Sequence, residues 1–215
     1  MEKKKKIKID EPTIPDHIIE LNIVQLEEER FFSLGKISDC SIEAEIDETV
    51  YFDKIIFKNV SFQYASFQSI ECTDVIFENC DLSNVDFSDA VFHRVKLKNS
   101  KLVGCNLSGA TFRNVQLEDC LANYASFGFS DYKQVRFINC LFTNADFYEA
   151  KIVKTEFKQC NLHLANFAEV DLNGLDISSC NFENITISMD KLAGCVVSKD
   201  QAVGFARAFG LVIKE

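Results

Sequence analysis

The sequence has no run of about 18 apolar residues, the length that a helix needs to cross a bilayer, so we expect no membrane-spanning segment. The N-terminal stretch MEKKKKIKIDEP begins with basic side chains but lacks the apolar segment and the small-residue cleavage site of a secretion signal. We therefore expect a cytoplasmic protein that does not interact with membranes.

The sequence also lacks the patterns that catalytic and metal sites require. No glycine-rich phosphate loop is present, because the glycines of the central region are isolated. They are Gly104, Gly109, Gly128 and Gly174. The histidines form no cluster with Ser, Cys or Asp, and we expect them to be exposed to solvent. They are His17, His93 and His163. We therefore expect a protein that is not an enzyme, with no catalytic residue, no metal site and no cofactor.

Positive charge is scarce compared with negative charge. The chain has 23 Lys and Arg against 33 Asp and Glu, which gives a formal net charge of −10. Such a chain is repelled by the phosphates of nucleic acids and by anionic lipids, and it attracts basic proteins. We therefore expect no direct binding to nucleic acid.

A bulky apolar residue occupies every fifth position from Phe52 to Leu192 without a slip. Two residues before each of these positions the side chain is commonly small or β-branched, as at Ala65, Val85 and Ala145. A period of five matches neither a strand, which repeats every two residues, nor a helix, which repeats every 3.6. The pattern predicts one elongated repeat body.

The nine cysteines follow the same period, since eight lie two residues before an apolar position and Cys72 occupies one. No Cys-x-x-Cys pair occurs. The favoured interpretation is therefore a small buried side chain in the place of Ala or Val, with zinc binding or disulfides as alternatives. We expect the thiols to stay reduced, because side chains stacked in parallel do not reach the disulfide dihedral.

The regularity of the chain suggests three parts: an N-terminal tail and capping segment (1–49), a repeat body (50–197) and a C-terminal helix and strand (198–215). In the first part, the run Lys3–Lys6 is interpreted as a solvated tail, with a basic arm as the weaker alternative. Pro12 and Pro15 predict an extended segment.

Two further elements are predicted before the repeat body. The spacing of Ile19, Ile23 and Leu26 predicts a short amphipathic helix within residues 16–30. Phe32 already lies in the five-residue phase, and so do Ile37 and Ile42. These residues predict one imperfect coil that covers the open end of the repeat body.

In the third part, Ser198 or Asp200 can cap a helix whose apolar stripe comprises Ala202, Phe205, Ala206 and Phe209. Gly210 suits the position just past the end of this helix, and the residues from Leu211 to Ile213 predict a short apolar strand. The helix is too short to be stable alone. It covers either its own last coil only, or a second subunit as well.

The repeat resembles that of the pentapeptide-repeat family, in which a small residue is followed by Asp or Asn, then by Leu or Phe, and then by two polar residues. Segments that match as they stand include ASFQS at 65, CDLSN at 80, VDFSD at 85, CNLSG at 105, ADFYE at 145 and ANFAE at 165. The resemblance implies an all-β fold, namely a right-handed quadrilateral parallel β-helix. Four repeats, or about 20 residues, form each coil, with Phe or Leu pointing to the axis.

Residues that are one coil, or 20 residues, apart in the sequence fall on the same side, which defines four sides. On two sides the charges nearly cancel, and a third side carries almost no charge. The fourth side consists of ASFQS, VDFSD, CNLSG, ASFGF, ADFYE, ANFAE and ITISM, and it contains no Lys or Arg. Its candidate partner-binding residues are Asp86, Asp89, Asp146, Glu149, Glu169, Phe129 and Tyr148.

Two interpretations of this fourth side remain open. It is either a solvated acidic surface or a docking surface for a basic protein that binds nucleic acid, since carboxylates aligned at regular spacing imitate a track of phosphates. The aromatic residues at outward positions favour the docking surface.

The C-terminal sequence carries a second resemblance. Gln201-Ala202, Phe205-Ala206 and the run from Phe209 to Ile213 are similar to the end of the quinolone-resistance (Qnr-type) pentapeptide proteins. The resemblance implies a homodimer formed tip to tip. The interface residues would be Ala202, Phe205, Ala206, Phe209, Leu211, Val212 and Ile213.

The same resemblance implies a non-enzymatic DNA mimic that binds DNA gyrase or topoisomerase IV and relieves quinolone inhibition. The uninterrupted phase from Phe52 to Leu192 leaves no room for the loops that project from many Qnr-type proteins, so the chain is similar to their loopless members. The alternative is an interaction scaffold for an unrelated protein partner.

Overall fold

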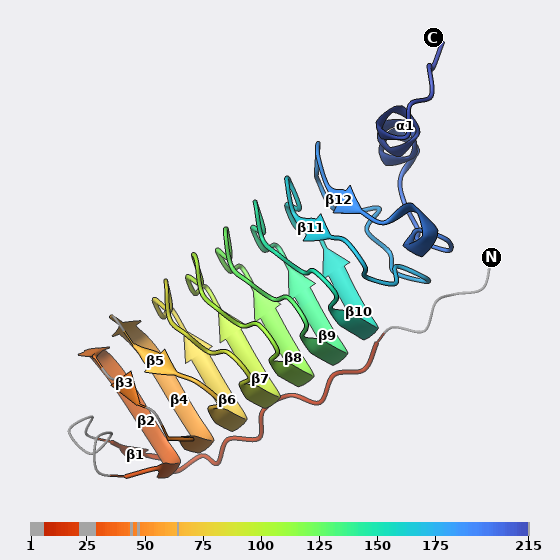
Figure 1. Ribbon diagram of the computed structural model, residues 1–215. Coiled ribbons are helices and arrows are strands. Elements are labelled where there is room, and N and C mark those ends of the chain that lie inside the picture. Colours follow the sequence, from red (N-terminus) through yellow and green to blue (C-terminus); the bar gives the residue numbers. More distant parts are fainter. Residues whose placement is uncertain (1–6, 22–28, 44, 47, 64, 215) are drawn as a thin grey trace.

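Each five-residue repeat forms one side of a coil, and every coil pairs in parallel with the next (Figure 1). The computed structural model describes residues 7–21, 29–43, 45–46, 48–63 and 65–214. In most of the paired strands the partners are separated by 20 residues, as in the series Phe57, Phe77 and Leu97. The result is a parallel β-solenoid of about eight turns with a short C-terminal helix, which confirms the predicted fold class.

One sheet of eight strands covers two adjacent sides of the solenoid. Its order is β1 (Ile19–Glu20), β2 (Phe31–Ile42), β4 (Tyr51–Phe62), β6 (Glu71–Glu78), β7 (Val91–Lys98), β8 (Thr111–Glu118), β9 (Asp131–Ile138) and β10 (Lys151–Lys158). Two small sheets pair β3 (Glu45–Ile46) with β5 (Ser66–Phe67), and β11 (Asn166–Phe167) with β12 (Thr186–Ile187). A 3-10 turn, η2 (Met189–Lys191), and the helix α1 (Lys199–Ala208) follow.

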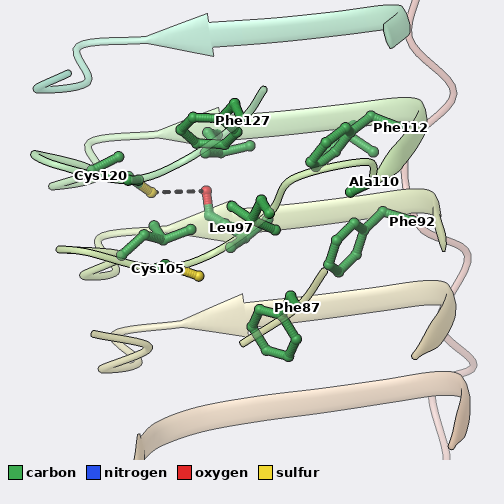
Figure 2. Packing of buried hydrophobic residues seen from close by; sticks show 14 of the residues in the cluster. Phe87, Phe92, Leu97, Cys105, Ala110, Phe112, Cys120 and Phe127 are labelled. Atoms are coloured by element: carbon green, nitrogen blue, oxygen red, sulfur yellow. Dashed lines mark hydrogen bonds between the residues drawn. The ribbon is translucent and has the colours of Figure 1, made fainter. Parts of the chain in front are cut away.

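The axis of the solenoid is filled by the five-residue phase. Every predicted apolar position from Phe52 to Leu192 is buried or half-buried. Phenylalanines of successive coils stack, for example Phe127 on Phe147, with ring centroids 4.9 Å apart and an interplanar angle of 5°. Figure 2 shows how Phe87, Phe92 and other core side chains interlock between coils. The interior is therefore a packed hydrophobic core.

The cysteines belong to this core. Seven are buried, Cys40 and Cys195 are half-buried, and none of the nine is in a disulfide. The thiols of the column Cys80, Cys120, Cys140, Cys160 and Cys180 donate hydrogen bonds to main-chain carbonyls. One runs from Cys120 to the carbonyl of Leu97 at 3.6 Å (Figure 2). Burial raises the pKa of the Cys80 thiol to about 11, although hydrogen bonds oppose the change. The cysteines therefore act as small buried side chains, as the repeat predicted.

The N-terminal segment differs in part from its prediction. Residues 7–18, here called the arm, are extended and run along the eight-stranded sheet, as Pro12 and Pro15 predicted (Figure 1). The helix predicted within residues 16–30 is wrong at Ile19–Glu20, which forms strand β1. The reason is that β2 offers an open edge, and parallel pairing with β1 satisfies its main-chain groups. Ile23, Leu26 and the run Lys3–Lys6 lie outside the described residues.

The C-terminal helix begins where the sequence placed it. Ser198, and not Asp200, is the cap: its hydroxyl accepts from the amide of Gln201 at 3.2 Å, and the Gln201 side chain accepts in return from the Ser198 amide at 2.8 Å. The side-chain amide of Gln201 also donates to the carbonyls of Ile177 and Cys180. The helix thereby covers open main-chain groups at the last coil.

The end of this helix agrees with the prediction, but the strand after it does not form. Gly210 has a φ of 84°, the left-handed conformation that a helix end commonly needs. The predicted strand from Leu211 to Ile213 is wrong, because within the described residues these three side chains are exposed and no strand pairs with them. No described helix is long and apolar enough to cross a membrane.

Candidate protein-binding face

One side of the solenoid, here called the acidic face, comprises residues 65–69, 85–89, 105–109, 125–129, 145–149, 165–169 and 185–189. Parallel bridges join the residue before each core position in successive coils. These bridged residues are Ser66, Asp86, Asn106, Ser126, Asp146, Asn166 and Thr186. The bridges hold the outward side chains in one straight column, about 4.8 Å apart.

Asp86 and Asp146 lie on the flat part of the face and are half-buried. Asp86 accepts hydrogen bonds from the amide of Ser88 at 2.9 Å and from the side chains of Gln68 and Asn106 at 2.8 and 2.9 Å. Asp146 accepts from the Tyr148 amide at 3.0 Å. These contacts tie both carboxylates into the coil, so part of their role is structural.

The environment keeps Asp86 charged. Partial burial acts to raise the pKa of its carboxyl, but the hydrogen bonds from Ser88, Gln68 and Asn106 outweigh burial and hold the pKa below its usual range. The carboxylate therefore stays ionised at neutral pH and contributes a fixed negative charge to the face.

Asp89, Glu149 and Glu169 lie at the corner where the acidic face ends, and all three are exposed. Their φ angles of 57°, 52° and 63° turn the chain into the next side of the coil. Because the turn directs these side chains away from the axis, their carboxylates are available to a partner. Glu169 also accepts a hydrogen bond from the Ser188 hydroxyl at 2.8 Å. Asp86 and Asp146 thus lie on the flat part of the face, and the other three carboxylates project from a corner.

Two aromatic side chains lie beside these carboxylates. Phe129 is 61% exposed and contacts Tyr148 edge to face, with ring centroids 5.5 Å apart. The hydrogen bond with Glu149 and the charge of that carboxylate raise the pKa of Tyr148. The structure therefore brings Phe129, Tyr148 and Glu149 together, as three of the predicted partner-binding residues.

Sequence analysis missed an exposed aromatic residue at the other corner of the acidic face, in the same coil as Phe129. Tyr124 is 66% exposed and has a φ of 60°. It follows the core residue Ala122 by two positions, as Phe129 follows Phe127. An aromatic residue two positions after a core residue is therefore the signal that identifies an exposed corner ring.

The carboxylates are not spaced as regularly as the sequence suggested. Asp86 and Asp146 are separated by coils that carry Asn106 and Ser126 in the same column. The seven blocks span about 29 Å at about 4.8 Å per coil. Duplex DNA carries about 17 charges over that length, whereas this face has five. The face resembles DNA in the sign and the alignment of its charges, but not in their density.

The described residues show no arrangement that suggests catalysis. His17 is exposed, as predicted, but His93 is half-buried and contacts the guanidinium of Arg94 at 3.0 Å. His163 is also half-buried, so the predicted exposure of these two residues is wrong. No group of three or more His, Cys, Asp or Glu within the described part of the chain could hold a metal ion.

The predicted dimer residues have different exposures. Phe205 is buried against Phe182 of its own chain, with ring centroids 5.5 Å apart, whereas Phe209 is half-buried. Val212 is 91% exposed, and Leu211 and Ile213 are exposed as well. Ala206 is half-buried and Ala202 exposed. Part of the stripe thus covers the last coil, and the residues after Gly210 are available to a second copy.

Two family models match the sequence. The model described as "Pentapeptide repeat region" covers residues 70–137, and the model described as "Pentapeptide repeats (8 copies)" covers residues 154–184. Neither description indicates a catalytic family. A comparison with curated protein sequences gives no significant match. The matched segments lie within the repeat body that was predicted from the five-residue phase.

Similar solved structures include QnrB1, described as a plasmid-mediated fluoroquinolone resistance protein. It is 15% identical, with 86% of this chain and 92% of that chain covered and a TM-score of 0.42. HetL, described as involved in heterocyst differentiation regulation in the cyanobacterium Nostoc, is 12% identical, with 81% and 94% covered and a TM-score of 0.30. Rfr23 from the cyanobacterium Cyanothece is 12% identical, with 82% and 97% covered and a TM-score of 0.22. The functions in these descriptions belong to those proteins.

Proposed function

We propose that this chain, a pentapeptide-repeat protein, is a non-enzymatic DNA mimic whose acidic face binds DNA gyrase or topoisomerase IV and protects the enzyme from quinolones. The observation that carries the proposal is the acidic face itself, which holds five carboxylates and no Lys or Arg. A field of one sign attracts a basic surface and speeds association.

The rigidity of the face supports the proposal. Main-chain bridges join the coils under the face, and buried rings stack beneath it. A partner therefore meets charges that are already in place, and binding costs little ordering of the protein. Phe129 and Tyr124 add exposed aromatic surface of the kind that commonly carries much of the binding energy at protein interfaces.

A homodimer would extend this surface. Leu211, Val212 and Ile213 are exposed at the C-terminal end of the solenoid and supply apolar area for contact with a second copy. Two copies joined at this end would form a rod with an acidic face of about 29 Å on each half. Gyrase and topoisomerase IV are proposed as partners because the C-terminal sequence resembles that of Qnr-type proteins.

The corner carboxylates allow a direct test. In a plasmid cleavage assay with gyrase and a quinolone, the wild-type chain should lower the amount of drug-stabilised cleavage. The variant with Asp89→Lys, Glu149→Lys and Glu169→Lys should require at least about tenfold more protein for the same effect. Lysine suits these turns, because Lys54 and Lys154 have the same positive φ at another corner.

A matched control makes the same change of charge elsewhere. Asp39→Lys, Asp119→Lys and Glu183→Lys replace exposed carboxylates that lie outside the acidic face. This control should protect gyrase about as well as the wild type. An equal loss of protection in both variants would show that net charge alone causes the effect. Unchanged protection in both variants would rule out the acidic face as the binding site.

The second candidate function is an interaction scaffold for an unrelated protein. It is favoured by the low charge density of the face and by the exposed rings of Tyr124 and Phe129, which suit an ordinary protein interface. Capture of bound proteins on the immobilised chain distinguishes the two. Recovery of gyrase or topoisomerase subunits supports the first proposal, and recovery of a different protein through the same corner residues supports the second.

A further inference from the structure

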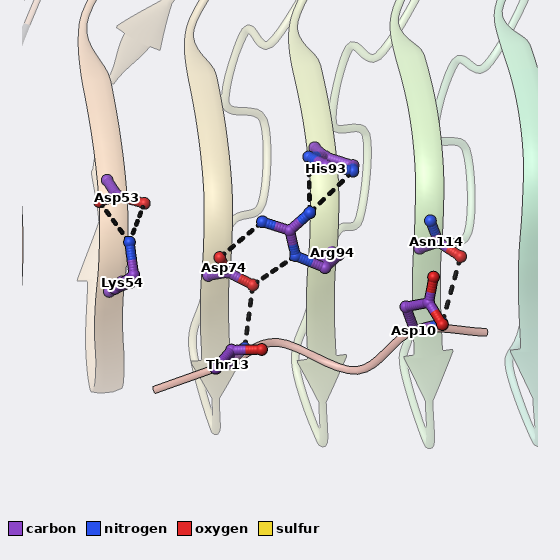
Figure 3. Close-up of polar contacts among 8 residues, drawn as sticks. All are labelled: Asp10, Thr13, Asp53, Lys54, Asp74, His93, Arg94 and Asn114. Carbon is purple, nitrogen blue, oxygen red and sulfur yellow. Dashed lines mark hydrogen bonds and ion pairs between the residues drawn. The ribbon is translucent and has the colours of Figure 1, made fainter. Parts of the chain in front are cut away.

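The arm is held by side chains of the eight-stranded sheet that contact its main chain. The guanidinium of Arg136 donates to the Ile7 carbonyl at 2.7 Å, and the side-chain amide of Gln134 donates to the Lys8 carbonyl at 3.0 Å. In the other direction, the amide of Asp10 donates to the Asn114 side chain at 3.1 Å, and the amide of Thr13 donates to Asp74 at 2.9 Å. Figure 3 shows the last two contacts.

These side chains come from one corner of the solenoid, here called the seat. It comprises Asp74, Arg94, Asn114 and Gln134, which have positive φ angles, together with Arg136. The seat is organised by its own contacts. Asp74 forms an ion pair with Arg94 through two contacts of 2.7 Å (Figure 3). Gln134 donates to Asn114 at 3.0 Å. The groups that receive the arm are thus oriented by the sheet.

The side chains that hydrogen-bond to the arm are polar, unlike the ring below α1. Asp74 is 3% exposed, and water can solvate its carboxylate when the arm leaves. Ile9 and Ile14 of the arm are half-buried and add apolar contact. Helix α1, in contrast, covers the apolar ring of Phe182. Exposing an apolar surface to water costs free energy, whereas exposing a polar surface costs much less. The arm therefore has the character of a removable ligand rather than a permanent cap.

The spacing of these contacts along the sheet fits an extended chain with a particular rise per residue. From Thr13 to Lys8 the arm passes from β6 to β9, which is three coil steps or about 14 Å. That is about 2.9 Å per residue, closer to the 3.1 Å of a polyproline II helix than to a β-strand. Pro12 and Pro15 are three residues apart, one turn of that helix. The seat therefore fits a proline-containing extended segment.

Charge adds a second criterion. Residues 7–18 contain Asp10, Glu11 and Asp16 but only one Lys or Arg, Lys8. The hydrogen bonds with Asp74 raise the pKa of Arg94, and the charge of Asp10 raises it further. Arg94 and Arg136 of the seat are paired with Asp74 and Glu156. Because the segment that fills the seat is itself net acidic, we take an acidic segment as the ligand.

We propose that the seat is a docking site for an extended acidic segment of a partner protein with prolines three residues apart, and that the arm occupies this site as an intramolecular ligand. Recognition uses the main chain of the segment, and the proline spacing and the charge provide selectivity. The seat and the acidic face occupy different sides of the coil, so the chain has two separate protein-binding surfaces.

The test uses the full chain and a fluorescent peptide with the sequence of residues 7–18. Ile9→Asp and Ile14→Asp together weaken the arm, because both side chains are half-buried, and leave the seat unchanged. Fluorescence anisotropy should show that the peptide binds this variant at least about tenfold more tightly than the wild type, whose tethered arm competes at an effective concentration of about 1 mM. His17→Ala changes an exposed arm residue that carries no acidic charge and should behave as the wild type.

Two further variants test how the segment is recognised. Arg136→Ala in the weakened chain should reduce peptide affinity at least about tenfold. A peptide with Pro12→Gly and Pro15→Gly should bind on the order of tenfold more weakly, since the free peptide then has more conformations to lose. Equal binding to the wild-type and weakened chains, no binding to the weakened chain at about 1 mM peptide, or binding that is insensitive to Arg136→Ala would overturn the proposal.

Discussion

Replacing Phe147 with alanine tests whether the core is packed as the five-residue phase requires. The Phe147 ring is 0% exposed and stacks between Phe127 and Phe167, with centroids 4.9 and 4.7 Å away. Main-chain bridges on both sides of Asp146 fix the coil spacing, so the neighbouring rings cannot close the gap. We expect a loss of about 4 kcal/mol in the free energy of unfolding, in the middle of the range for Phe→Ala.

Urea unfolding followed by circular dichroism measures this loss, with Phe129→Ala as the matched control. Phe129 belongs to the neighbouring coil of the same side but is exposed, so its replacement should change the free energy of unfolding by less than about 1 kcal/mol. A loss below about 2 kcal/mol for Phe147→Ala, or equal losses for the two variants, would refute the assignment of inward and outward positions.

Three further predictions concern the arm, the thiols and the C-terminal end. Burial acts to raise the pKa of Asp74, but hydrogen bonds from Arg94 and Thr13 outweigh it and lower the pKa in the folded state. The stabilisation by this carboxylate is therefore present above the unfolded pKa of about 4 and is lost as pH falls through the folded pKa. Asp74→Asn should cost about 1–3 kcal/mol at pH 7, and unfolding curves at low pH should show a smaller difference; a constant cost would contradict this. In a thiol-reagent titration of the native chain, only Cys40 and Cys195 should react rapidly, because the other seven cysteines are buried; early reaction of more thiols would contradict the core assignment. Val212→Asp should convert the proposed dimer to a monomer in light scattering without loss of stability, because this side chain is exposed, and an unchanged dimer would exclude it from the interface.

The repeat body was predictable because one physical requirement, an apolar side chain at every inward position, recurs without interruption. The same holds for the two ends of α1. Ser198 and Gln201 favour a helix start, and Gly210 favours a helix end. In these segments the nearest residues in sequence determine the structure, so pattern and geometry agree.

The position of the arm could not be predicted from the sequence. Its contacts join Thr13 to Asp74 and Lys8 to Gln134, over 61 and 126 residues, and no local pattern encodes such pairs. The error at Ile19 has a similar cause, because the open edge of β2 outweighs a weak helical spacing. Tyr124 was missed because the repeat identifies inward positions clearly, whereas corner positions accept residues as different as Gly104, Tyr124 and Leu164.

Competition with DNA tests the central proposal most directly. A fluorescent DNA duplex bound to gyrase is titrated with the wild-type chain, and the bound fraction of the duplex is measured by anisotropy. We predict full displacement of the duplex, with a half-displacement concentration that depends on salt because both ligands use the same basic surface. A complex that contains gyrase, the duplex and this chain together at saturation would contradict the account.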